Sequence, residues 1–323
     1  MPHLPYLADV AHAFGQSVAL ELTTQLSKKS TDVRCAVSTA TVMAASTERH
    51  VQLDGINYYT LLEGSGNSDK DAPIVLLVHA LMSNLHMYDA TVKALHQHGY
   101  RTLRYDHVGH NKTLPPPEGV SLHIDDITRH AHALVEAVTG QSHVKAVIGC
   151  SIGGTIAWRY AMLFPKDVDR IIALASPGIK SPEVAHKLWS QRIEMFEEDL
   201  RNGTDKLYHQ TVDRWFPNGR PEDDVVRREC LLHVKTCDIR GYKILADAIR
   251  SYDYEAEVAE IGKVKTLVVA GEEDQAGRAD VLEEVSKQIP GAEFVVMKRT
   301  GHLPPMHKPE EFNQLMLRFL GEQ

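Results

Sequence analysis

The sequence predicts an α/β fold in which helices cover both faces of a mostly parallel sheet. Short apolar runs typical of buried strands alternate with segments of helical character along most of the chain. A Gly-x-Ser-x-Gly motif at residues 149–153 lies between such a strand and such a helix. Residues 178–257 interrupt the alternation with a charged, helical segment that is too long for an ordinary crossover. Together these observations predict one α/β core with an inserted helical segment.

The chain begins with an amphipathic helical pattern. Its apolar residues recur at helical spacing: Leu7, Val10, Phe14, Val18, Leu22 and Leu26. We therefore expect residues 1–48 to form an N-terminal helical extension that packs on the main fold. A homodimer formed through this helix and a weak targeting sequence are the alternatives, although Asp9 and Glu21 argue against a mitochondrial presequence.

The first half of the sheet is predicted by apolar runs and by one turn signal. Asp54-Gly55 is a tight hairpin signal between two strand-like segments. The continuous apolar run at 74–78 is typical of a central strand that is buried on both faces. The elements expected here are strands at 49–53, 56–62, 74–78, 101–105 and 144–148, with helices at 86–98 and 124–138.

The second half of the sheet is divided by the long insertion. The elements expected here are a helix at 155–164, strands at 169–175, 265–270 and 293–297, and a C-terminal helix at 309–320. Roughly ninety residues separate the first two of these strands, far more than a crossover helix needs. We therefore predict a helical cap at 178–257, inserted in a core that is formed by 49–177 and 258–323.

Gly149-Cys150-Ser151-Ile152-Gly153 predicts a nucleophile elbow, because the strand and the helix around the motif supply the required context. The sharp turn holds the serine in strained backbone geometry, where a Cβ at either flanking glycine would collide with neighbouring atoms. A serine hydroxyl is a poor nucleophile unless a base lies within hydrogen-bond reach and a third group orients that base.

The sequence offers one preferred candidate for the orienting acid and one for the base. Asp274 lies in the loop that leaves the carboxyl end of a predicted strand, where catalytic groups of open α/β sheets gather. Glu272 and Glu273 are its alternatives, since spacing alone does not rank neighbouring carboxylates. His302 follows the last predicted strand, behind a glycine, and is preferred as the base over His307.

An acyl-transfer site also needs two backbone N–H groups for a developing oxyanion. We expect one from Ile152, directly after the serine. The other is expected from Leu81, in the loop at residues 79–82 that follows a central strand.

Composition excludes several classes of function. The net charge of −8 argues against a nucleic-acid partner, and no apolar run reaches the length that spans a bilayer. The four cysteines form no Cys-x-x-Cys pair, which favours reduced thiols and a cytoplasmic protein.

No cofactor is expected either. The paired histidines, of which His107-x-x-His110 is one, have no accompanying thiolates or ordered carboxylates, so no metal site is predicted. No phosphate-binding glycine motif is present, so no nucleotide cofactor is implied.

These motifs resemble the α/β-hydrolase superfamily, over nearly the whole chain beyond about residue 48. The matching segments are His79-Ala80-Leu81, Asp106-His107-Val108-Gly109-His110, the Ser151 motif, 271–274, Gly301-His302 and 309–312. Within the superfamily, the sequence is most similar to the 3-oxoadipate enol-lactonase-like group. That similarity lies in the predicted cap, in Trp189-x-x-Arg192, Arg214-Trp215-Phe216 and Gly241-Tyr242.

The sequence departs from the family pattern at several positions. Ala80 replaces the usual glycine of the oxyanion loop, and Asn111 and Thr113 replace a glycine and a serine after the fourth strand. The N-terminal extension is also not part of the enol-lactonase pattern. These departures bear on which substrate the family resemblance implies, and not on the roles of Ser151, Asp274 and His302.

The resemblance implies a serine hydrolase of the carboxylic ester hydrolase or lactonase type, acting on a small, partly apolar ester or lactone through an acyl-enzyme. The residues expected to bind substrate are Met82, Trp189, Arg192, Trp215 and Phe216. Internal packing of the cap is the alternative for the apolar side chains, and a structural salt bridge is the alternative for Arg192. A non-hydrolytic Ser-His-Asp enzyme and a ligand-binding receptor are the rival functions.

Overall fold

The computed structural model describes residues 46–64 and 71–321. The predicted N-terminal extension, including its apolar residues from Leu7 to Leu26, lies outside the described residues. The boundaries predicted between core and cap stay predictions.

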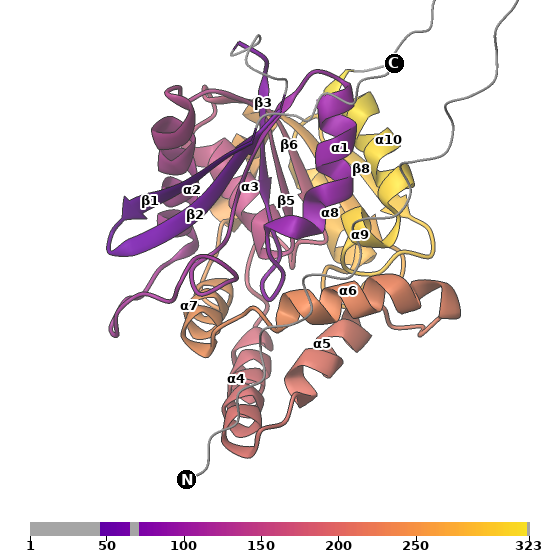
Figure 1. The fold of residues 1–323 in the computed structure, drawn as a ribbon. Helices are drawn as coiled ribbons and strands as arrows, with labels where there is room; N and C mark the ends of the chain where they lie inside the picture. Colours follow the sequence, from indigo (N-terminus) through magenta and orange to yellow (C-terminus); the bar gives the residue numbers. More distant parts are fainter. Residues whose placement is uncertain (1–45, 65–70, 322–323) are drawn as a thin grey trace, which may run out of the picture. The chain divides into compact units, whose positions relative to one another are not determined.

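An eight-stranded sheet organises the described residues (Figure 1). The strands are β1 (Ser46–Leu53), β2 (Ile56–Glu63), β3 (Ile74–Val78), β4 (Arg101–Tyr105), β5 (Val144–Cys150), β6 (Val168–Leu174), β7 (Lys265–Gly271) and β8 (Glu293–Met297). Their order in the sheet is β1-β2-β4-β3-β5-β6-β7-β8. β2 pairs antiparallel with β1 and β4, and every other pairing is parallel. The mostly parallel sheet predicted from the sequence is confirmed.

Helices lie on both faces of the sheet. The helices are α1 (Asp89–Gln97), α2 (Ile124–Thr139), α3 (Ile152–Leu163), α4 (Ala185–Asn202), α5 (Lys206–Trp215), α6 (Asp224–Val234), α7 (Ile239–Ile249), α8 (Ala279–Gln288), α9 (Pro304–His307) and α10 (Pro309–Leu320), with 3-10 turns η1 (Leu85–Tyr88), η2 (Pro221–Asp223) and η3 (Glu255–Lys263). α1 packs with α10, and α2 packs with α3. The chain steps from β3 to β4 and then back across β3 to β5, so right-handed crossovers place α1 and α2 on opposite faces.

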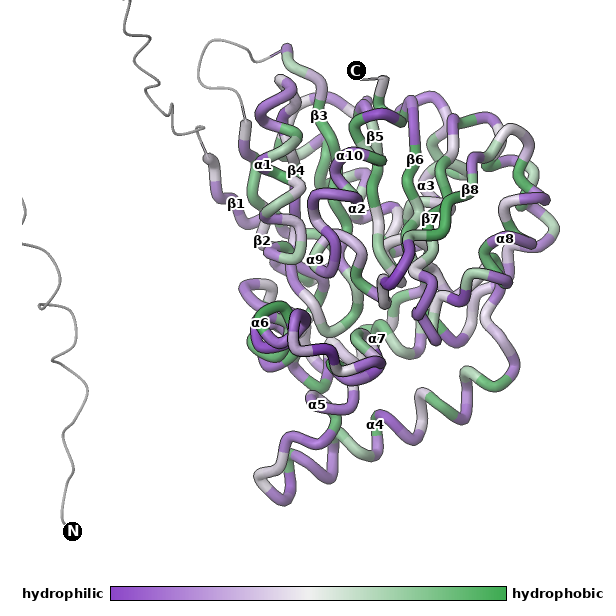
Figure 2. Tube along the Cα trace, turned by 90° about the vertical axis from the view of Figure 1, so that its right-hand side faces the viewer, coloured by the Kyte–Doolittle hydropathy of each residue, from purple (hydrophilic) through white to green (hydrophobic). Residues whose placement is uncertain are grey.

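The core follows from the apolar runs of the central strands. All five residues of β3 are buried, and β5 and β7 are buried over nearly their whole length. Figure 2 shows these strands largely in the green of hydrophobic residues. A parallel strand that is covered by helices on both sides has no solvated face, which accounts for its continuous apolar sequence. No helix among the described residues combines the length and the apolar character needed to cross a bilayer.

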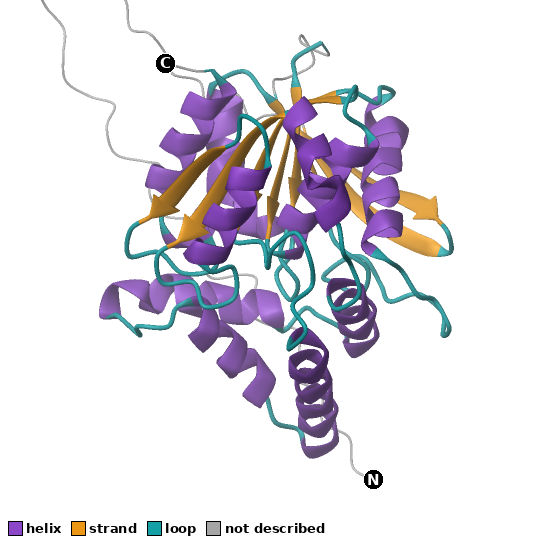
Figure 3. Ribbon diagram, turned by 180° about the vertical axis from the view of Figure 1, so that it is seen from behind, coloured by secondary structure: helices purple, strands orange, loops and turns teal. Residues whose placement is uncertain are grey.

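Helices α4 to α7 lie beyond the carboxyl ends of the parallel strands (Figure 3). They fall within the segment that the sequence predicts as helical. The loop between α6 and α7 runs beside the loop that follows β4: Asn111 N–H donates to Thr236 O at 3.0 Å, and Asp238 N–H donates to Gly109 O at 2.8 Å. These bonds fix the helical segment to the sheet domain next to one of the loops that carry family motifs.

Two local differences from the predicted elements have simple causes. α3 begins at Ile152, three residues earlier than predicted, because glycines at 153 and 154 allow the helix to start within the crowded turn. The predicted helix at 86–98 is divided into η1 and α1, where Asn84 caps the 3-10 turn by accepting a bond from His86 N–H.

The contact of α7 with the loop after β4 depends on a small residue. A Cβ at Gly241 would overlap the carbonyl oxygen of Val108 and the Cα of Gly109. Gly241→Ala is therefore expected to lower the free energy of unfolding by about 1–3 kcal/mol, measured by urea denaturation. Arg240→Ala, at the exposed neighbouring position, is the control and should cost less than about 0.5 kcal/mol. Equal stability of the two variants would contradict this packing.

Candidate active site

Ser151 stands at a strained turn between β5 and α3. Its backbone lies at φ 58° and ψ −119°, a conformation that residues with a side chain rarely adopt. A Cβ at Gly149 would overlap Gly153 O, and a Cβ at Gly153 would overlap Val78 O. Glycine is therefore required at both positions, as the sequence predicts. Cys150 and Ile152 are fully buried, whereas the Ser151 side chain is partly exposed.

Asp274 and His302 form a buried pair. His302 Nδ1 lies 2.8 Å from Asp274 Oδ2, and both side chains are at most 5% exposed. The other carboxylate oxygen, Oδ1, accepts a bond from Ala276 N–H at 2.8 Å. Because the carboxylate accepts the proton of Nδ1, the lone pair of the neutral imidazole is on Nε2.

The alternative residues make other contacts. Glu272 pairs with Lys298, and Glu273 pairs with Arg220. His307 Nδ1 accepts a bond from Gly301 N–H at 2.8 Å, and its Nε2 lies 3.1 Å from Asp223 Oδ1. Both ring nitrogens of His307 are thus engaged, and the structure brings together the preferred acid and base rather than their alternatives.

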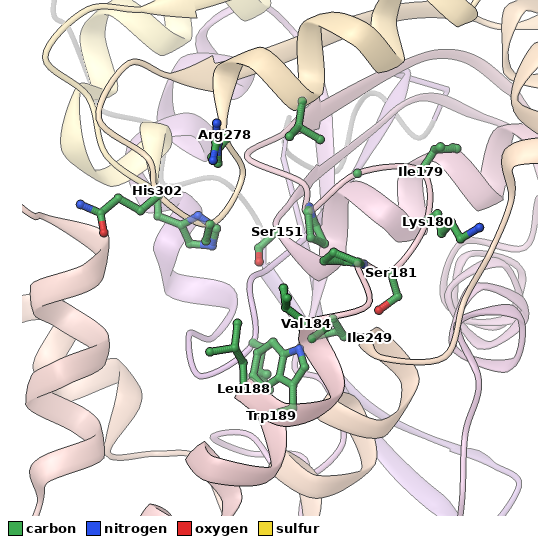
Figure 4. Close-up of a pocket in the computed structure, with 18 of the residues that line it drawn as sticks. Ser151, Ile179, Lys180, Ser181, Val184, Leu188, Trp189, Ile249, Arg278 and His302 are labelled. Atoms are coloured by element: carbon green, nitrogen blue, oxygen red, sulfur yellow. The ribbon is translucent and has the colours of Figure 1, made fainter.

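Ser151 and His302 both line one cavity of about 880 Å³, and Figure 4 shows their side chains facing it from neighbouring loops. Within the described part of the chain, the Ser151 hydroxyl makes no hydrogen bond with the His302 ring. Hydrogen bonds between a catalytic serine and histidine are often long before substrate binds, so this arrangement is compatible with proton transfer from Ser151 to His302. The volume is large enough for a ligand of ordinary small-molecule size.

The loop after β3 leaves one amide free beside this cavity. Met82 N–H donates to His110 Nε2 at 3.0 Å, Ser83 N–H donates to Ala80 O at 2.9 Å, and Ala80 N lies 3.4 Å from Met87 Sδ. Leu81 N–H has no acceptor among the residues that the structure describes. Leu81 also lines the cavity. Ile152 is the first residue of α3, and the first amides of a helix have no acceptor within it.

Three histidines are buried behind this loop. The rings of His79, His107 and His110 lie with centroids 4.3 to 6.3 Å apart. Burial lowers the pKa of His107 to about 3 and that of His110 to about 4, and it holds the pKa of His79 well below its usual range. All three are therefore neutral near pH 7. The sequence singled out His107 and His110 as a histidine pair, but did not predict their contact with the loop.

Four of the five predicted substrate-binding residues line the cavity: Met82, Trp189, Arg192 and Trp215. Phe216 does not line it. Its buried ring packs edge-on against His307, with centroids 4.9 Å apart. Neighbouring residues at the end of α5 point in different directions, so a Trp-Phe pair places only one ring in the cavity. The Trp215 ring stacks over the His302 ring, with centroids 6.3 Å apart. The backbone carbonyl of Trp215 also accepts a hydrogen bond from the His302 N–H.

Two arginines face the cavity without an acidic partner. The guanidinium carbon of Arg192 lies 4.8 Å from the centroid of the Trp189 ring. The guanidinium group of Arg214 donates a hydrogen bond to Thr211 Oγ1 at 3.2 Å. Neither forms an ion pair with a described carboxylate. Burial lowers the pKa of both guanidinium groups, and the charge of Arg192 contributes to lowering that of Arg214 to about 10. The sequence had singled out Arg192 for this site but gave Arg214 only as part of a family pattern.

The buried neutral histidines make stability depend on pH. The histidines with a lowered pKa and nearly complete burial are His79, His107, His110, His233 and His307. Below pH 6.5 the unfolded chain binds protons at these residues and the folded chain does not, so stability falls as the pH falls from about 6.5 toward 4. Urea denaturation at pH 7 and pH 5 should show a loss of at least about 2 kcal/mol at pH 5.

His110→Gln removes one of these groups and serves as the control for this effect. Its stability should depend less steeply on pH over the same interval. A free energy of unfolding that is the same at pH 7 and pH 5 would contradict the neutral, buried state of these rings.

Comparison with known proteins gives the same fold. A family model described as the alpha/beta hydrolase fold matches residues 73–216. A putative 2-succinyl-6-hydroxy-2,4-cyclohexadiene-1-carboxylate synthase from Bacillus subtilis is 23% identical, over 83% of this chain and 96% of that protein. Lipase 1 from Psychrobacter immobilis is 26% identical over 73% of each chain.

Among solved structures, the enol-lactonase from Burkholderia xenovorans LB400 superposes with a TM-score of 0.74. It is 23% identical, over 84% of this chain and all of that one. The strand order, the strained Ser151 turn and these similarities lead to one conclusion: the chain has the α/β-hydrolase fold.

Proposed function

We propose that this protein is a serine hydrolase that cleaves an ester or lactone of a small, partly apolar substrate through an acyl-enzyme. One observation carries the proposal. Ser151, at its strained turn, faces the same cavity as His302, whose Nδ1 is held by the buried carboxylate of Asp274. An oriented base beside a serine is the arrangement that activates a hydroxyl for nucleophilic attack. The lipase and enol-lactonase among the similar proteins favour carboxylic ester chemistry.

The reaction then follows from the geometry in two steps. His302 Nε2 takes the proton of Ser151 as the oxygen attacks the substrate carbonyl. The amides of Leu81 and Ile152 hold the oxyanion of the tetrahedral intermediate, and His302 returns the proton to the leaving alkoxide. Water repeats the cycle on the acyl-enzyme, which releases the acid. Asp274 keeps the Nε2 lone pair directed at the serine and stabilises the imidazolium that forms.

In this proposal, helices α4 to α7 act as a cap that shapes the substrate cavity. Met82, Trp189 and Trp215 supply apolar and aromatic surface next to Ser151. Arg192 and Arg214 add two positive charges that have no carboxylate partner in the described structure. Charges that are partly withdrawn from water are ordinarily paired, so these two half-buried groups favour a substrate that carries a carboxylate. Such a substrate combines an apolar body with one anionic group.

The rival reaction is non-hydrolytic chemistry by the same three residues. One relative carries a synthase name, and a single fold supports many reactions. The products separate the two functions, because a hydrolase incorporates one oxygen of solvent water into the released acid. Mass analysis of products formed in ¹⁸O-labelled water decides between hydrolysis and rearrangement or bond cleavage without water.

The nucleophile is tested with a fluorophosphonate probe and mass spectrometry. A stable adduct is expected on Ser151, because the activated oxygen attacks phosphorus as it attacks a carbonyl. Ser151→Ala is the matched variant and should carry no adduct. Turnover of a short panel of 4-nitrophenyl esters and lactones should accompany labelling. An unlabelled, inactive and well-folded wild type would contradict the proposed function.

The anionic substrate is tested by comparing two 4-nitrophenyl esters of similar size. The butyrate ester is neutral, whereas the monoester of glutarate ends in a carboxylate. Arg192→Gln and Arg214→Gln are each expected to reduce kcat/KM for the glutarate ester at least tenfold, which corresponds to about 1.4 kcal/mol. The butyrate ester should lose less than about threefold. Equal losses on both esters would show that the arginines support packing rather than recognition.

A further inference from the structure

His110 lies between the loop after β3 and the helical segment. Its Nδ1 lies 2.9 Å from Val108 O, so this nitrogen carries the proton and donates to the carbonyl. The lone pair is therefore on Nε2, which accepts the Met82 N–H at 3.0 Å and also lies 3.3 Å from Cys237 Sγ. The ring is fully buried, and the Val108 bond fixes its tautomer.

The bond from Met82 to His110 holds a backbone conformation that is otherwise unfavourable. Met82 has φ 67°, in the left-handed region, which costs a residue with a Cβ about 1–2 kcal/mol. The bond from the Met82 amide fixes the peptide plane between Leu81 and Met82, which adjoins the plane that carries the Leu81 N–H. The neighbouring amides of Ala80 and Ser83 are bonded within the protein. Leu81 N–H is left beside the cavity that contains Ser151.

The start of the same loop is held by the other two histidines. His107 N–H donates to His79 Nε2 at 2.9 Å, and His79 Nδ1 donates to Ala80 O at 2.8 Å. His107 Nε2 lies 3.0 Å from His79 O and completes the connection. Both ends of the Ala80–Met82 stretch are thus fixed to the loop after β4, and His110 is the contact nearest to the free amide.

We propose that His110 is a positioning residue for the oxyanion hole. Its Nε2 accepts the Met82 amide and thereby keeps the Leu81 amide directed at the oxygen of the tetrahedral intermediate. The inference rests on the proposed function, because the oxyanion exists only if Ser151 attacks a carbonyl. His110 itself does not line the cavity and does not touch the reacting atoms.

The loop that carries His110 is itself fixed in place. Gly109 and Asn111 bond to Asp238 and Thr236 of the α6–α7 loop. Asn111 adopts φ 47°, and its side chain donates to Asp106 Oδ2 at 2.9 Å. Asparagine tolerates the left-handed conformation better than most residues, which explains why it can replace the usual glycine here. Because the residues on both sides of His110 are held in place, its ring can fix the position of the Met82 amide.

Two isosteric substitutions separate this role from simple packing. In His110→Gln, the amide oxygen reaches the position of Nε2 and can still accept the Met82 amide. In His110→Asn, the shorter side chain reaches only the position of Nδ1, so it keeps the Val108 contact and loses Met82. Both variants remove the ring, and thermal unfolding of each reports the loss of packing.

The expected result is a difference in kcat between these two variants. With 4-nitrophenyl butyrate as substrate, His110→Asn should lose at least tenfold in kcat with KM within about twofold, and His110→Gln should recover most of the loss. Phenylboronic acid, which binds as a tetrahedral adduct of the serine, should lose affinity for His110→Asn in parallel. Where butyrate turnover is slow, the rate of fluorophosphonate labelling gives the same comparison.

Two controls complete the test. His130→Gln changes a buried histidine that bonds to Tyr58 and Asp54, away from this loop, and should leave kcat within about twofold. Cys237→Ala removes the thiol beside Nε2 and keeps the Met82 bond, so it too should change kcat little. A loss in Cys237→Ala as large as that in His110→Asn would overturn the assignment of the Met82 bond.

Equal kcat values for folded His110→Asn and His110→Gln would overturn the inference. The proposed function would still stand in that case, because it depends on the activity of the wild type. A wild type that neither turns over ester nor accepts the fluorophosphonate would overturn the proposed function, and the inference with it.

Discussion

The close approach of the Ser151 turn to the end of β3 is the constraint on which the rest of the site depends. Gly153 packs so tightly against Val78 O that a Cβ does not fit. The serine turn and the loop that begins at His79 must therefore lie side by side. This contact brings the loop of Leu81 to the turn of Ser151; both residues line the cavity, and Ile152 directly follows the serine. Glycine at 149 and 153 is thus a requirement of the site as much as of the fold.

Much of the fold and the core of the site could be predicted because their signals are local. Continuous apolar runs identified the central strands, and a serine between glycines identified the strained turn. Asp274 and His302 could be placed near Ser151 because the carboxyl ends of parallel strands meet at one edge of the sheet. The preference for these residues over Glu272, Glu273 and His307 came from position in the chain, and the structure shows those three engaged elsewhere.

What the sequence could not predict depends on contacts between distant segments. Phe216 packs on His307 instead of lining the cavity, because the direction of each side chain at the end of α5 is decided by packing. Arg214 became a candidate only when the structure showed that it lines the cavity and forms no ion pair with a described carboxylate. His110 and Met82 are 28 residues apart, and no spacing rule connects a histidine with an amide in another loop. The same holds for the attachment of α7 to the loop after β4 through Gly241.

A crystal structure of the protein after reaction with a fluorophosphonate tests the central claim most directly. The account predicts a phosphonyl group on Ser151 Oγ, with its free oxygen within about 3 Å of both the Leu81 and Ile152 amides. His302 should remain bonded to Asp274, with Nε2 facing the oxygen atoms bound to phosphorus. An adduct whose oxygen points away from these amides, or an adduct on another residue, would contradict the account of the site.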